Sequence, residues 1–166
     1  MGPMNHQMLE VDQVVNLHGA VAPSSATPIR FSMKEFDRAT ILIFQNKSAG
    51  NGCAVSMNQA QDVSGTGSKT LSFTKAKRSL ANGTQAAPVN AWESFDVASD
   101  TFTTDATNGT RDSYAIDITK DMLDIDNDFD VVELELGNAA SNVIQAIAIL
   151  HRARNAAFPN ESGVAN

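Results

Sequence analysis

Residues 38–74, RATILIFQNKSAGNGCAVSMNQAQDVSGTGSKTLSFT, decide the fold. Two turns rich in Gly, Asn and Ser divide the stretch into three segments of strand-forming residues. This pattern predicts a β-meander of three consecutive antiparallel strands. Residues 41–44 (ILIF) are apolar at every position. Because a strand with two apolar faces is covered on both sides, we expect residues 41–44 to form a central strand, or a strand whose second face meets another chain.

Strand patterns continue through the rest of the chain. Two segments alternate apolar and polar residues, and the positions expected to face the core are Tyr114, Ile116, Ile118, Val132, Leu134 and Leu136. The intervening Glu133 and Glu135 are expected to face water. We also predict a strand at residues 91–98, one helical turn at residues 119–123, and tight turns at the Asn-Gly pairs 51–52, 82–83 and 108–109.

The last apolar segment, residues 143–150 (VIQAIAIL), fits a helix or a strand by composition. The preceding turn at Gly137-Asn138 favours a strand, paired with residues 131–136. The small side chains Ala146 and Ala148 would allow a second layer to approach this strand closely.

The distribution of strands predicts three regions. We expect an extended N-terminal arm at residues 1–30, a β-sandwich domain at residues 31–150 and an irregular C-terminal tail at residues 151–166. The arm is either a loose terminus or a segment that becomes ordered against a neighbouring subunit. Seven or eight strands separated by Gly/Asn turns predict a mainly β protein, an antiparallel β-sandwich or barrel of jelly-roll type.

Composition narrows the possible functions. The chain has 166 residues, of which 42% are hydrophobic and 19% charged, enough apolar material for a folded core. Its net charge of −7 argues against binding to nucleic acid, whose phosphates require a basic face. Since no apolar run approaches the roughly 20 residues of a membrane-spanning helix, we expect neither nucleic acid nor a membrane as a partner. The single cysteine, Cys53, excludes an internal disulfide, and we expect no secretory signal.

Two motifs resemble ligand sites but depart from the required spacing. Residues 65–69 (GTGSK) lack the Gly that a phosphate-binding loop places directly before its Lys, and strand-forming residues follow them instead of a helix. Residues 124–130 alternate aspartates as a calcium-binding EF-hand loop does, but Phe129 stands where that loop needs Gly. The alternating residues are Asp124, Asp126, Asp128 and Asp130. This segment is either a solvated acidic turn anchored by Phe129 or an adventitious calcium site.

Catalytic groups are scarce in the sequence. Nothing in the spacing of the three histidines, His6, His18 and His151, places one of them beside Cys53 as a thiol–imidazole pair. No two carboxylates occur in a pattern that indicates a paired acid and base. We therefore expect no enzyme, and we assign no catalytic, cofactor-binding or metal-binding residue.

Four segments together resemble a known group of proteins. They are residues 38–44 (RATILIF), 59–73 (QAQDVSGTGSKTLSF), 114–118 (YAIDI) and 121–132 (DMLDIDNDFDVV). They resemble small structural proteins of tailed bacteriophages that belong to the head-morphogenesis region and are described as virion or capsid-associated proteins. The resemblance covers residues 31–150, and its most specific parts are the DVSGTGSK turn and the DMLDIDNDFD stretch.

The resemblance implies a β-rich virion protein that has no catalytic residues and binds an icosahedral head shell as a decoration or cement protein. The implied partners are the major capsid protein and further copies of the chain, with a trimer as the working assumption. The implied location is the virion capsid, assembled in the host cytoplasm. Two alternatives remain: a head–tail connector or tail protein, and a carbohydrate-binding β-sandwich that uses Trp92, Tyr114 and the acidic turn with calcium.

Overall fold

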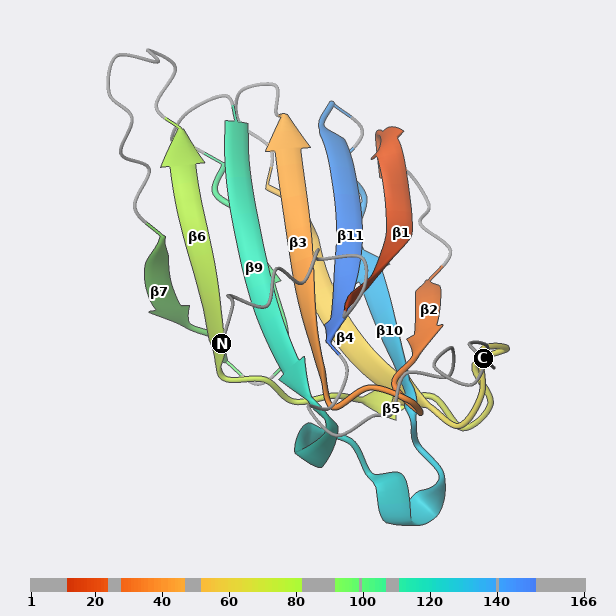
Figure 1. Cartoon of the computed structure of the whole chain (residues 1–166). Coiled ribbons are helices and arrows are strands. Elements are labelled where there is room, and N and C mark those ends of the chain that lie inside the picture. The colour runs from red at the N-terminus through yellow and green to blue at the C-terminus, as the bar shows by residue number, and fades with distance from the viewer. Residues whose placement is uncertain are drawn as a thin grey trace, which may run out of the picture.

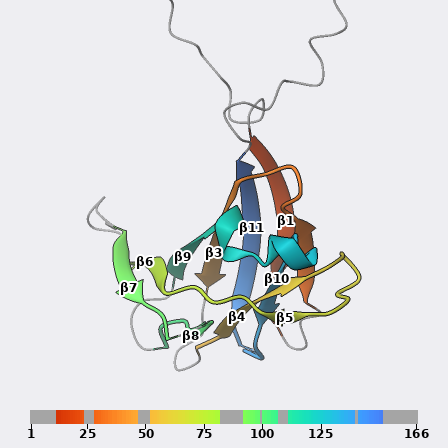
Figure 2. The ribbon, with the colours of Figure 1, turned by 90° about the horizontal axis from the view of Figure 1, so that it is seen from below.

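The chain folds into two antiparallel β-sheets packed face to face, as a computed structural model shows (Figure 1). The structure describes residues 12–23, 28–46, 52–81, 92–98, 100–106, 111–139 and 141–151. In Figure 1 the larger sheet faces the viewer and the smaller sheet lies behind it. Figure 2, a view from below, shows the two sheets as separate layers.

The larger sheet has six strands in the order β1-β11-β3-β9-β6-β7. Their bounds in chain order are β1 Asp12–Val21, β3 Arg38–Asn46, β6 Lys75–Ala81, β7 Glu93–Asp96, β9 Arg111–Thr119 and β11 Val143–His151. β3 therefore lies in the interior of the sheet, which confirms the central position predicted for residues 41–44. The sheet ends at β1 and β7, which do not pair with each other. The fold is thus the predicted β-sandwich, and the closed-barrel alternative is wrong.

The smaller sheet has five strands, four of them in the order β2-β10-β4-β5, with β8 also pairing with β4. Their bounds are β2 Ile29–Ser32, β4 Ala54–Ala60, β5 Lys69–Thr70, β8 Thr101–Thr103 and β10 Val131–Leu136. Two single 3₁₀ turns, η1 (Lys120–Met122) and η2 (Ile125–Asn127), connect β9 to β10. η1 confirms the helical turn predicted at residues 119–123. None of the helices among the described residues is long and apolar enough to cross a membrane.

The core lies between the two sheets, where their apolar faces exclude water from each other. The alternation predicted for β9 is confirmed, and in β10 every apolar position expected to face the core is buried, although Glu133 is buried as well. Ala146 and Ala148 of β11 have no exposed surface, which agrees with a close approach of the second layer. At one side of the core, the Phe95 and Phe102 rings meet edge to face with their centroids 5.3 Å apart, a favourable aromatic geometry.

The pairing predicted from neighbouring strands is wrong in two places. β3 and β4 lie in different sheets, so residues 38–74 are not a simple meander, and only the second turn joins paired strands, β4 and β5. β11 is a strand as predicted, but it pairs with β1 and β3 and not with β10. Turn residues mark where a chain reverses; they do not specify whether it returns to the same sheet or crosses to the facing one.

Part of the segment expected to be an extended arm is strand β1, at the edge of the larger sheet. Its pairing with β11 shifts register after Asn16 and again after His18. At such shifts the residues of β1 no longer oppose those of β11 one to one, and burial along β1 does not follow a two-residue alternation. Residues 1–11, including His6, the tail 152–166 and the turns at 82–83 and 108–109 lie outside the described residues.

Candidate functional site

The side of the six-stranded sheet that is turned away from the smaller sheet, here called the outer face, carries an apolar surface in the middle of the sheet. Its apolar side chains come from four adjacent strands, and polar side chains lie among them. The apolar residues are Val14, Leu42, Phe44, Ala115, Val143, Ile147 and Ile149, and the polar ones are Thr40, Ser113, Asp117 and Gln145. Phe44 is 40% exposed, and Val14 and Val143 are exposed to a similar degree.

This exposure corrects the expectation that both faces of residues 41–44 are covered. Ile41 and Ile43 are fully buried in the core, whereas the described residues leave Leu42 half-buried and Phe44 exposed on the outer face. The second alternative, that this face meets another chain, stays a prediction.

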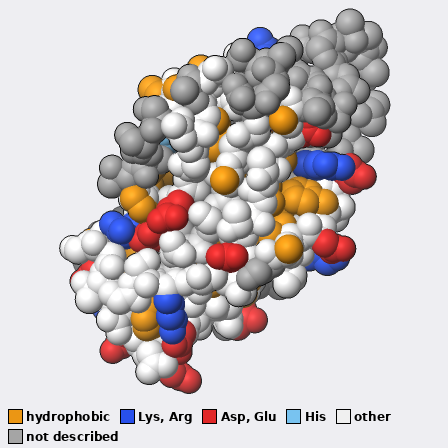
Figure 3. All heavy atoms as spheres, turned by 180° about the vertical axis from the view of Figure 1, so that it is seen from behind, with side chains coloured by type: hydrophobic (Ala, Val, Ile, Leu, Met, Phe, Trp, Pro, Cys, Tyr) orange, Lys and Arg blue, Asp and Glu red, His pale blue; other side chains and the backbone are white. Residues whose placement is uncertain are grey.

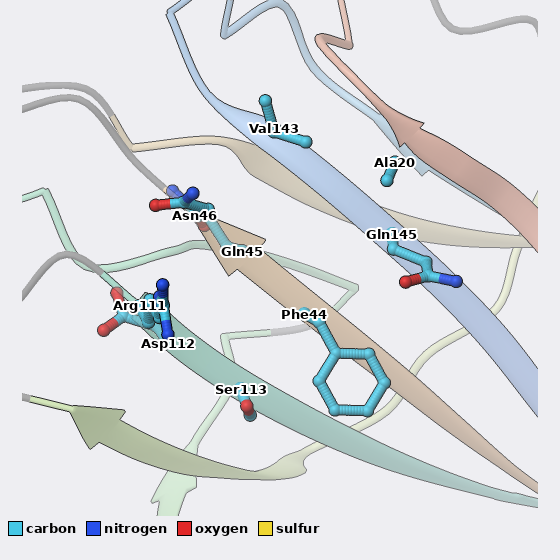
Figure 4. A pocket seen from close by; sticks show the side chains of 9 residues that line it. All are labelled: Ala20, Phe44, Gln45, Asn46, Arg111, Asp112, Ser113, Val143 and Gln145. Atoms are coloured by element: carbon cyan, nitrogen blue, oxygen red, sulfur yellow. The ribbon is translucent and has the colours of Figure 1, made fainter. Parts of the chain in front are cut away.

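A shallow hollow of about 260 Å³ lies beside Phe44 (Figure 4). Its lining residues are Ala20, Phe44, Gln45, Asn46, Arg111, Asp112, Ser113, Val143 and Gln145. Figure 4 shows the Phe44 ring on β3 between the side chains of Ser113 and Gln145 on the two neighbouring strands. Both neighbours are polar and either small or flexible, and 40% of the surface of Phe44 is exposed.

The opposite side of the molecule, formed by the smaller sheet, carries charged side chains of both signs. Figure 3 shows acidic and basic side chains beside one another there, over the smaller sheet. Arg30 Nε of β2 donates a hydrogen bond of 2.5 Å to Glu133 Oε2 of β10, and the Asn58 amide donates to Oε1 at 3.4 Å. Glu133 was expected to face water, but its side chain is only 3% exposed. The partner Arg30 explains this burial, since a paired carboxylate tolerates loss of water.

The turn at residues 61–68 helps to cover this ion pair. A Cβ atom on Gly65 would lie 2.4 Å from Arg30 Nη2, so the backbone of the turn packs directly against the guanidinium. Gly65 has a φ of +90°, which side-chain-bearing residues rarely adopt. The N–H groups of Ser64 and Thr66 and the Thr66 hydroxyl all donate to the carboxylate of Asp62.

Those hydrogen bonds, above all the one from the Thr66 side chain, lower the pKa of Asp62. In a phosphate-binding turn, such N–H and hydroxyl groups would donate to the bound phosphate. Here they donate to the carboxylate of Asp62, which belongs to the turn itself. The segment that the sequence singled out as phosphate-loop-like serves to position the backbone over Arg30.

The acidic segment, residues 124–130, is also held by internal contacts. The Asp124 carboxylate accepts hydrogen bonds from Lys69 and Asn127, which lower its pKa. Phe129 is 7% exposed and lies under the Lys69 ammonium, 3.8 Å from its ring centroid. Phe129 thus anchors the turn as predicted. Among the described residues, no group of three or more His, Cys, Asp or Glu side chains is arranged to hold a metal ion.

The aromatic pair considered for carbohydrate binding is not a surface pair. Trp92 is 48% exposed, but Tyr114 is 1% exposed and its hydroxyl accepts a hydrogen bond from the Asp105 N–H at 2.7 Å. Burial raises the pKa of Tyr114 to about 12. A ring inside the core cannot stack on a sugar, so the carbohydrate alternative loses one of its two aromatic residues.

Cys53 is a core residue and not a nucleophile. Its side chain has no exposed surface, and its thiol donates to the carbonyl of Gly137 at 3.2 Å. Burial raises the pKa of this thiol to about 11, and the hydrogen bond with Gly137 opposes the rise only in part. Since the thiolate is the reactive form, Cys53 is unreactive at neutral pH. His18 lies elsewhere, with its Nδ1 3.0 Å from the carbonyl oxygen of Ile144.

A chain of polar side chains crosses four strands at one end of the outer face. His151 of β11 has Nδ1 2.9 Å from Asp12 Oδ1 of β1 and Nε2 3.1 Å from Thr40 Oγ1 of β3. The Thr40 hydroxyl donates to Asp117 Oδ1 of β9 at 2.8 Å, and Arg38 Nη2 lies 2.9 Å from the same oxygen. Sequence reasoning missed this arrangement, because only the strand order brings these residues together.

The connectivity carboxylate–imidazole–hydroxyl resembles that of a catalytic triad. The Thr40 hydroxyl, however, gives its proton to Asp117 and not to the imidazole, so it is not activated as a nucleophile. Thr40 also lies within a strand paired on both sides, where the backbone N–H groups that could stabilise an oxyanion are used in the sheet. The arrangement therefore supports no nucleophilic chemistry.

Comparison with known proteins assigns no family to the chain. No family model matches the sequence, and no curated protein matches it. Among solved structures, the crystal structure of SPBc2 prophage-derived protein YomS is similar over 84% of this chain and 92% of that chain, with 13% sequence identity and a TM-score of 0.41. At this TM-score the similarity assigns neither a function nor a partner.

Proposed function

We propose that the chain is a structural protein that binds another protein through the outer face of its six-stranded sheet. One observation carries the proposal: Phe44 of the central strand β3 is 40% exposed beside a hollow that Ala20 and Val143 also line. Exposed aromatic residues next to hollows are typical anchors of protein interfaces, where they contribute much of the binding energy.

The resemblance of residues 31–150 to capsid-associated phage proteins suggests the class of partner. On this basis we propose a virion protein that decorates or cements a phage head shell, with the major capsid protein as its partner. Many symmetric copies on a shell would raise the overall affinity beyond that of a single modest patch. A homo-oligomer in the assembled particle is part of the same proposal.

The proposal is tested by co-sedimentation of the purified chain with empty head shells assembled from the cognate major capsid protein. Phe44→Glu places a charge in the proposed interface and is expected to abolish co-sedimentation. Val63→Glu is the matched control, because Val63 is 62% exposed in the turn over the other sheet. Shell binding by Phe44→Glu equal to that of the parent chain, or no shell binding by the parent chain, would contradict the proposal.

A head–tail connector or tail protein remains the second candidate, since it would use an exposed apolar face in the same way. The number of copies in purified virions separates the two. Hundreds of copies indicate decoration of the shell, whereas the number found in a few rings indicates a connector.

A further inference from the structure

We propose that the hollow beside Phe44 binds an acidic segment of the partner protein, which places an apolar side chain against Phe44 and a carboxylate against Arg111. Both residues line the hollow. The inference rests on the proposed function, since it names the chemistry of the segment that the outer face would bind.

The polar groups around the Phe44 ring are rich in hydrogen-bond donors. Arg111, the first residue of β9, is exposed and is paired in register with the exposed Asn46, the last residue of β3. Gln145 of β11 lies on the other side of the ring (Figure 4). A guanidinium offers five N–H donors and no acceptor, and each amide adds two donors. A carboxylate would accept from these groups in charge-assisted hydrogen bonds.

The carboxylates of Asp12 and Asp117 lie at the opposite end of the outer face and have cationic or polar neighbours there. Asp12 contacts His151 at 2.9 Å, and Asp117 contacts Arg38 at 2.9 Å. Lys77 also acts on Asp117 and helps to lower its pKa. The charges at that end are therefore largely balanced by one another.

The end of the outer face beside Phe44 is not balanced in this way. Within the described ranges, no carboxylate forms an ion pair with Arg111. Asp112, which also lines the hollow, is 2% exposed and lies on the core side of β9. The chain has a net charge of −7, yet the surface next to Phe44 presents a cation. A partner carboxylate would complement it.

The apolar part of the hollow acts together with this charge. Phe44 and Val143 are 40% and 42% exposed, and an apolar side chain of the partner would cover both. Covering them removes water from the neighbourhood of Arg111, which strengthens its attraction to a carboxylate. The hollow therefore favours a segment that carries an apolar and an acidic side chain close together.

Co-sedimentation with head shells tests the charge. Arg111→Gln is expected to weaken binding about tenfold at low salt, as for the loss of one charge pair in an interface. The difference from the parent chain should shrink as the salt concentration rises from about 50 to about 300 mM. Lys34→Gln is the matched control and should change binding less than about twofold. It removes the same charge from an exposed residue in the turn before β3, at the opposite end of that strand.

A peptide tests the hollow without the shells. Acetyl-Asp-Leu-Asp-amide, added to on the order of 10 mM, is expected to shift the amide NMR signals of Phe44, Ser113 and Gln145. The peptide acetyl-Asn-Leu-Asn-amide, or the Arg111→Gln chain with the acidic peptide, should give much smaller shifts. If the parent chain does not bind shells but these Arg111-dependent shifts occur, the proposed function fails and the inference about the hollow stands.

Three results would overturn the inference. They are equal or absent shifts with the two peptides, shell binding by Arg111→Gln equal to that of the parent chain, and self-association of the parent chain that Arg111→Gln abolishes in analytical ultracentrifugation. The last result would assign the hollow to a second copy of the chain. If shell binding still depends on Phe44, the first two results refute the inference alone and leave the proposed function in place.

Discussion

Arg30→Met is expected to lower the free energy of unfolding by about 3 kcal/mol. The change removes the guanidinium but keeps the aliphatic part of the side chain, so packing is largely preserved. Glu133, whose side chain is 3% exposed, then keeps only the Asn58 amide, at 3.4 Å, as a side-chain donor among the described residues. Breaking a buried ion pair from one side costs about 3–5 kcal/mol. The lower end applies because Arg30 is 21% exposed and water can enter in its place.

Urea unfolding followed by circular dichroism measures the effect. With an m-value of about 2 kcal/mol/M, a loss of 3 kcal/mol moves the midpoint down by about 1.5 M. Lys75→Met is the matched control: it breaks the Lys75–Asp96 pair, whose side chains are 72% and 82% exposed, and should cost between 0 and about 1 kcal/mol.

The double variant Arg30→Met/Glu133→Leu distinguishes an unpaired charge from lost packing. Removing both charges leaves nothing buried and unpaired, so the double variant should be more stable than Arg30→Met alone by about 2 kcal/mol. A cost below 1 kcal/mol for Arg30→Met, or a double variant less stable than the single one, would refute the reasoning.

Two further changes follow from the same physical description. Gly65→Ala should destabilise the fold by about 1–3 kcal/mol in the same urea assay, because φ at Gly65 is +90° and the added Cβ would lie 2.4 Å from Arg30 Nη2. Gly19→Ala is the control and should be nearly neutral, because no atom lies within 4 Å of the added Cβ. Cys53 makes the fold sensitive to alkali: its thiol pKa is raised from 9.0 to about 11 by burial, so stability present below pH 9 is lost as the pH rises through 11. Cys53→Ala should show a smaller loss of stability between pH 9 and 11 than the parent chain, and an equal loss would contradict this assignment.

Local patterns predicted the strands well because alternation depends on neighbouring residues alone. The inward positions of β9 and β10, the strand at Glu93–Asp96 and the strand nature of β11 followed from two-residue periodicity and turn residues. The pattern failed at β1, where the register shifts interrupt the period. It also failed at Glu133, since the partner that allows its burial, Arg30, lies 103 residues away in the sequence.

Strand pairing and the candidate site could be predicted only in part. The apolar run at residues 41–44 predicted that both faces of the strand are covered, whereas the structure leaves Phe44 40% exposed on the outer face. The side chains that surround Phe44 come from β9 and β11, and the chain of polar side chains around His151 joins four strands. These neighbours depend on which strands cross between the sheets, and no local signal in the sequence encodes that choice.

The place of β11 between β1 and β3 also constrains how the chain folds during its synthesis. β11 ends at residue 151 and is the last described strand to leave the ribosome, yet it lies in the interior of the larger sheet. Until it arrives, β1 has no neighbour in its sheet and one edge of β3 is unpaired, which exposes both to pairing with other chains. The larger sheet is therefore completed only after β11 has been made, and the long sequence separation of its pairs favours slow folding, on the order of milliseconds to seconds.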